Sequence, residues 1–98
     1  MEINKVVDDK KCTIELTGRL DTLTSPQLEE ALKEVPEDTN ELVLDLKELE
    51  YVSSAGLRVF LNAQKGMTDK GTMTLKNVNE EIMEVLEMTG FTQILTIE

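Results

Sequence analysis

The chain has 98 residues, which is enough for one domain and too few for two. Hydrophobic residues make up 40% of it but aromatic residues only 3%, so a folded core must be mainly aliphatic. Ten basic against twenty acidic residues give a net charge of −10, which argues against direct binding to nucleic acid or to an anionic membrane. No signal-peptide pattern or membrane-spanning apolar run is present, so we expect a cytoplasmic protein, and the charge favours a monomer.

Few residues in the sequence are suited to catalysis or cofactor binding. There is no histidine, which excludes Ser-His and Cys-His dyads and histidine-based metal sites. The single cysteine, Cys12, falls on the apolar side of an alternating stretch, so we expect a buried core thiol. The five glycines do not have the spacing of a phosphate-binding loop. We therefore expect no cofactor or metal, and a binding or switching protein rather than an enzyme.

The first third of the chain predicts a hairpin followed by a helix. Apolar residues at 6–7 and 12–16 flank a polar turn at 8–11, and polar residues alternate with the second apolar set, as in a strand. Residues 24–27, Thr-Ser-Pro-Gln, are typical of a helix start, with the Thr24 hydroxyl as N-cap and Pro26 in the first turn. Leu28, Ala31, Leu32 and Val35 follow at helical spacing, and Pro36 ends the run.

The rest of the chain alternates strands and helices. Residues 41–46 are an almost continuous apolar strand, of the kind covered on both faces, and residues 47–50 are a polar connection. A helix from Ala55 to about Lys70 precedes a strand at 72–76, a third helix capped by Asn79, and a last strand from Phe91 to Ile97. The order β-β-α-β-α-β-α-β predicts one α/β domain, residues 1–98, with a partly parallel sheet and right-handed crossovers.

Two adjacent hydroxyls, Ser53 and Ser54, lie where the third strand meets the second helix. A serine here predicts an N-cap that accepts a hydrogen bond from a free amide of the first turn, but one cap explains only one hydroxyl. The helix that follows has a wide apolar face, so either neighbouring elements enclose it or part of it binds a partner. Its N-terminus would tolerate a phosphate on a serine, whereas a docked apolar or acidic partner would not.

Three stretches resemble STAS domains, and most closely the stand-alone bacterial anti-sigma factor antagonists. Residues 18–21, Gly-Arg-Leu-Asp, followed by Thr24, resemble the family's G-x-L-D segment. Residues 42–46 and 51–57 resemble its central strand and phosphorylation loop, and residues 86–91 resemble its late helix-to-strand turn. The resemblance implies a STAS-like mixed β-sheet with helices packed against it.

The resemblance also implies a partner switch. In that family the unmodified antagonist binds an anti-sigma factor that is also a serine kinase, and so releases a sigma factor. Phosphorylation of a loop serine breaks the complex, and a serine phosphatase removes the phosphate. The family motif, Asp-Ser-Ser/Thr-Gly, implies Ser54 as the phosphoacceptor, with Ser53 at the Asp position as the alternative acceptor. The implied partner surface comprises Asp21, Thr22, Ser53, Ser54, Gly56, Leu57 and Arg58.

A second function stays open because Ser53 replaces the carboxylate of the family motif. The alternative is a STAS adaptor that is not phosphorylated and docks on a transporter or another regulator. In that case Ser54 acts only as an N-cap, and its replacement by alanine costs about 1 kcal/mol of stability.

Overall fold

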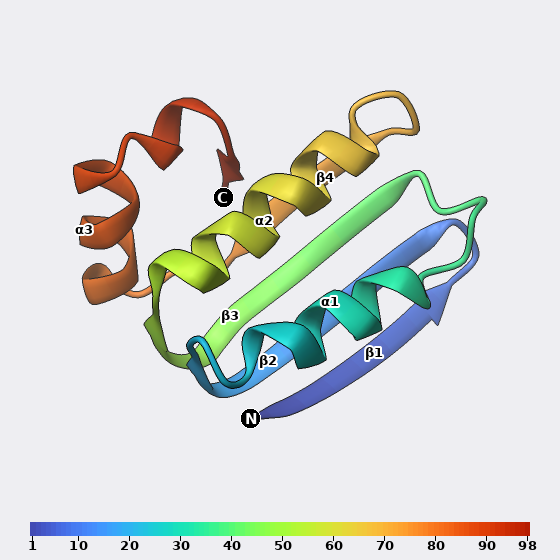
Figure 1. The fold of residues 1–98 in the computed structure, drawn as a ribbon. Coiled ribbons are helices and arrows are strands. Elements are labelled where there is room, and N and C mark those ends of the chain that lie inside the picture. The colour runs from blue at the N-terminus through green and yellow to red at the C-terminus, as the bar shows by residue number, and fades with distance from the viewer.

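The protein is a five-stranded mixed sheet with three α-helices, described by a computed structural model of residues 1–98 (Figure 1). Its elements are β1 (Glu2–Asp8), β2 (Lys11–Leu20), α1 (Ser25–Lys33), β3 (Glu41–Val52), α2 (Ser54–Met67), β4 (Thr72–Lys76), α3 (Glu80–Met88), a 3-10 turn η1 (Phe91–Gln93) and β5 (Thr96–Ile97). The strand order is β1-β2-β3-β4-β5; β1 is antiparallel to β2, and the other pairs are parallel. The predicted hairpin, element order and partly parallel sheet are confirmed.

The core lies between one face of the sheet and the helices. Side chains paired across the central strands, such as Ile14, Leu44 and Leu75, form this face, and the inner residues of all three helices join them in one cluster. Figure 1 shows α1 in front of β1 and β2, and α2 in front of β3 and β4. Cys12 belongs to the cluster and is fully buried, as predicted, and burial raises the pKa of its thiol although Lys5 partly opposes the shift. None of the helices combines the length and apolar content that crossing a membrane requires.

The opposite face of the sheet is polar, so the prediction that residues 41–46 are covered on both faces is wrong. Val43 is 2% exposed there, but its ladder neighbours are Thr13 and Thr74 and it stands outside the core cluster. The next row on this face is Glu15, Asp45 and Lys76. Polar side chains can occupy this face because the helices pack on the other one.

The prediction of a polar connection at residues 47–50 is also wrong, because β3 continues through them to Val52. Pairing with β2 persists across two register shifts, one after Glu15 and one after Gly18, whose φ is +106°. The shifts allow Leu49 and Val52 to remain buried although the apolar alternation is interrupted. As a result β2 and β3 end together at one edge of the sheet.

The last predicted strand is mostly absent. Gly90, at φ +80°, ends α3, and residues Phe91–Gln93 form a 3-10 turn in which the amides of Ile94 and Leu95 donate to the Phe91 carbonyl. Only Thr96 and Ile97 pair with β4. Phe91 and Leu95 both pack on the core, so the apolar residues of this stretch follow a helical turn and not strand alternation.

Candidate functional site

Two connections lie side by side at the end where β2 and β3 stop (Figure 1). One is the loop from β2 into α1, residues 21–24, and the other is the junction from β3 into α2, residues 52–54. A hydrogen bond holds the second connection to the end of β2, because the Ser53 N–H donates to the Leu20 carbonyl over 2.9 Å. The parallel pairing of β2 with β3 brings their carboxyl ends to one edge, and so brings Asp21 near Ser53 and Ser54.

The two serines have different surroundings. Ser53 is the N-cap of α2: its backbone is extended, its Oγ accepts from the Gly56 N–H over 3.3 Å, and its carbonyl accepts from the Leu57 N–H over 2.9 Å. Ser54 is the first helical residue and its side chain is exposed. The capping role that the adaptor alternative gave to Ser54 therefore belongs to Ser53, and the Ser54 hydroxyl is left for other chemistry.

Alanine substitutions separate these two roles. We expect Ser53→Ala to lower the free energy of unfolding by about 1 kcal/mol, because the Gly56 N–H loses its acceptor. Ser54→Ala should change it by less than about 0.5 kcal/mol, because the exposed hydroxyl is not the cap. Urea denaturation followed by circular dichroism measures both values. A larger loss for Ser54→Ala than for Ser53→Ala would contradict the assignment of the cap.

The loop before α1 is held by a small hydrogen-bond network around Asp21. The Asp21 carboxylate accepts from the N–H groups of Leu23 (3.0 Å) and Thr24 (3.1 Å). The Thr24 hydroxyl accepts from the Asp21 N–H over 2.8 Å and donates to the Arg19 carbonyl over 2.7 Å. The prediction that this hydroxyl caps α1 is wrong, since it bonds backward into the loop. Asp21 thus fixes the shape of the loop that presents Thr22 and Leu23.

The same network sets the protonation of Asp21. Desolvation alone would raise the pKa of its carboxyl, but hydrogen bonds from Thr24 and Leu23, with the positive charge of Arg19, lower the pKa below the ordinary value of 3.8. A group with a depressed folded-state pKa stabilises the fold above its unfolded-state value, and that contribution is lost as the pH falls through the folded-state value.

We expect an NMR titration of the Asp21 carboxyl to give a midpoint below 3.8. The amide signals of Leu23 and Thr24 should move with the same midpoint, because both N–H groups donate to this carboxylate. In Asp21→Asn those amide signals should not titrate in this range. A midpoint at or above the ordinary value would show that the loop network is not formed in solution.

Other exposed side chains lie in the same two connections and at the strand ends that lead into them. Leu23 is 86% exposed and Tyr51 is 40% exposed. The Arg19 guanidinium stacks on the Tyr51 ring, 4.2 Å from its centroid, and its Nε lies 3.9 Å from an Asp21 oxygen. We call Arg19, Asp21, Leu23, Tyr51 and Ser54 the serine surface. Sequence reasoning missed Leu23 and Tyr51, although an isolated leucine in the polar loop Asp-Thr-Leu-Thr was a usable signal.

The remaining predicted site residues divide into two kinds. Thr22 and Arg58 are exposed, in the loop and in the first turns of α2. Gly56 and Leu57 are buried, so they do not present a contact surface. A Cβ on Gly56 would lie 2.7 Å from Leu20 Cγ and 2.9 Å from Val52 Cγ2, so this glycine lets the start of α2 pack closely on β2 and β3. By packing on the strands, Gly56 and Leu57 therefore hold the start of α2, and with it Ser54, in place.

Comparison with known proteins agrees with this fold. The family model described as "Mlab, STAS domain" matches residues 3–96. The anti-sigma-B factor antagonist of Bacillus subtilis is 29% identical over 100 aligned residues, which cover 99% of this chain and 92% of that protein. An anti-sigma factor antagonist from Mycobacterium paratuberculosis has a TM-score of 0.89 at 20% identity, covering 98% of this chain and 83% of that one. The phosphorylated form of the Bacillus cell fate determinant SpoIIAA has a TM-score of 0.72 at 15% identity, covering 99% and 91%. Because the family model extends over nearly the whole chain, this protein belongs to the STAS domain family.

Proposed function

We propose that this STAS domain is an anti-sigma factor antagonist controlled by phosphorylation of Ser54. The unphosphorylated chain binds an anti-sigma factor that is also a serine kinase, and so frees a sigma factor in the cytoplasm. Phosphate on Ser54 breaks that complex, and a serine phosphatase restores the binding form. The observation that carries the proposal is the exposed Ser54 hydroxyl on the first residue of α2, beside a neighbour, Ser53, that already supplies the cap.

The position of Ser54 suits a modification that changes binding without unfolding the domain. A phosphate adds a charge of about −1.5 to −2 at neutral pH. The N-terminal end of a helix favours such an anion, through its free amides and its dipole. Arg58 lies four residues further along α2 and is exposed, at the spacing of a favourable helical pair with an acidic group. The domain should therefore remain folded in both states.

The rest of the serine surface accounts for partner binding. Leu23 and Tyr51 offer apolar area that a partner can bury, and the net charge of −10 favours encounter with a basic partner. A doubly charged phosphate at Ser54 would have to be desolvated in such a contact, which is costly without a paired cation. The names of the curated relatives, anti-sigma-B factor antagonists, support the same role.

The proposal is tested by capturing the partner from a lysate of the source organism on the immobilised monomeric protein. We expect an ATP-binding serine kinase to be retained, to be released when ATP is added, and to leave phosphate on Ser54 when the chain is mapped by mass spectrometry. Immobilised Ser54→Ala should retain the kinase after ATP addition. Phosphate on Ser53 would identify the alternative acceptor and contradict the assignment to Ser54.

A second function, the STAS adaptor without phosphorylation, is favoured by one observation. The position before Ser54 holds Ser53, a helix cap, where the family motif has a carboxylate. An adaptor would dock on a transporter or another regulator through the same exposed residues. It predicts that the captured partner is not a kinase and that ATP does not release it.

A further inference from the structure

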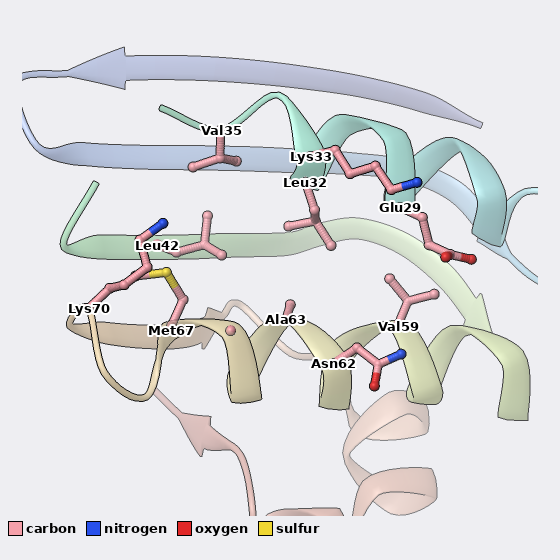
Figure 2. A pocket seen from close by; sticks show the side chains of 11 residues that line it. Glu29, Leu32, Lys33, Val35, Leu42, Val59, Asn62, Ala63, Met67 and Lys70 are labelled. Carbon is pink, nitrogen blue, oxygen red and sulfur yellow. The ribbon is translucent and has the colours of Figure 1, made fainter. Parts of the chain in front are cut away.

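A groove lies between α1 and α2, toward the ends of the two helices that are far from Ser54 (Figure 2). Its volume is about 290 Å³. Leu42 of β3, Leu32 of α1 and Val59, Ala63 and Met67 of α2 form an apolar interior. Glu29, Lys33, Asn62 and Lys70 stand around the opening. None of these residues belongs to the serine surface, so the groove is separate from the site described above.

Gly66 lines this groove, and because it has no side chain it leaves space there unfilled. It is inside α2 and does not have a positive φ, so the backbone does not require glycine there. A Cβ at this position would meet no atom within 4 Å, so packing does not require glycine either. Glycine destabilises a helix interior relative to alanine. The structural consequence of this residue is open space beside the apolar interior.

One cation at the opening is free to bind an anion. The charged residues there are Glu29, Lys33 and Lys70. Lys33 Nζ lies 3.6 Å from a Glu30 carboxylate oxygen, whereas no ion pair is formed by Lys70. Lys70 is therefore the cation that remains for a ligand.

We infer that this groove binds a small aliphatic carboxylate, with its chain along Leu32, Val59 and Met67 and its carboxylate at Lys70. The apolar interior matches the chain, since ligand sites are mainly apolar with a few polar groups that fix orientation. The volume is at the lower end of the range for such sites, which suits a medium-length chain and is too small for a partner helix. This inference does not depend on the proposed function of Ser54.

The test is an NMR titration of the labelled protein with decanoate, kept below the concentration at which it forms micelles. We expect saturable shifts for the amides of Leu32, Ala63 and Gly66, with a single dissociation constant. Decanol has the same chain without the charge and should bind about threefold more weakly, the loss expected for one exposed ion pair. Lys70→Gln should weaken decanoate binding by about the same factor and leave decanol binding unchanged. Lys65→Gln on the same helix does not touch the groove, so it should bind decanoate like the wild type.

A variant that fills the groove provides a second, independent test of the inference. Gly66→Leu places a side chain into the open space and should weaken binding of both probes by more than about tenfold. A circular dichroism melt shows whether this variant is folded. If it is not folded, the Lys70→Gln variant, which replaces an exposed side chain, tests the inference in its place. Non-saturating or scattered shifts, equal binding of decanoate to Lys70→Gln and to the wild type, or undiminished binding to folded Gly66→Leu would each overturn the inference.

Discussion

Ser54→Asp is expected to weaken binding to the captured anti-sigma factor by at least about thirtyfold, because a charge placed in a desolvated contact costs several kcal/mol. Ser54→Ala should bind within about threefold of the wild type, since the hydroxyl is neither the cap nor buried. Isothermal titration calorimetry with the purified partner measures both affinities. The melting temperatures of both variants should match that of the wild type, which separates lost binding from lost folding.

Ser53→Asp is the matched control for this experiment. Aspartate caps a helix as well as serine does, so the Gly56 N–H keeps an acceptor and α2 keeps its start. This variant carries the same added charge one residue earlier, directed at the helix amides and not at solvent. We expect its affinity to stay within about threefold of the wild type. Equal weakening by both aspartates would show that net charge alone is responsible, which would contradict a specific switch at Ser54.

The order of the elements could be predicted from local patterns. Alternating residues in 12–16 identify β2, and the Asn79 side chain caps α3 by accepting from the Ile82 N–H over 2.9 Å, as its position after a strand suggested. Pro26 in the first turn placed the start of α1 correctly. These signals are local because each involves a residue and neighbours within four positions along the chain.

The features that were predicted wrongly depend on neighbours that are distant in sequence. Three of the four residues 47–50 are charged, but the pairing of Glu48 with Thr17 and of Leu49 with Gly18 across the register shifts keeps them in β3. The Thr24 hydroxyl is an exception: it would cap an isolated helix, yet the Asp21 N–H and the Arg19 carbonyl, three and five residues earlier in the chain, engage it. Val43 is buried between strands on a face without a helix, which an apolar run alone cannot distinguish from burial under one.

The candidate site, too, could be predicted from the sequence only in part. The resemblance assigned Ser54 and Asp21 to one surface, and the strand topology explains why the two connections that carry them lie side by side. It could not tell which serine caps α2, because two adjacent hydroxyls both fit the pattern and only the backbone geometry of Ser53 decides. Nor could it show that Gly56, inside the same motif, faces Leu20 and Val52 while Ser54 faces solvent.

Gly56→Val should lower the free energy of unfolding by about 3 kcal/mol, and Gly56→Ala by about 1 kcal/mol. The added carbons would overlap Leu20 and Val52, which are both buried and cannot move away freely. The gain in helix propensity offsets only part of this overlap in the alanine variant. Urea denaturation measures both changes, with Gly66→Ala as the control: no atom lies within 4 Å of its Cβ, so it should raise stability by up to about 1 kcal/mol.

The result for Gly56 also decides its part in partner binding. If it acts by packing, Gly56→Ala should lose stability yet bind the partner with nearly wild-type affinity under conditions in which it is folded. The serine surface would then still be presented by α2 and the loop that Asp21 orders. A Gly56→Ala variant as stable as the wild type that no longer bound the partner would place Gly56 in the contact itself. That outcome would require α2 to separate from β2 on binding, because Leu20 and Val52 enclose this position in the free domain.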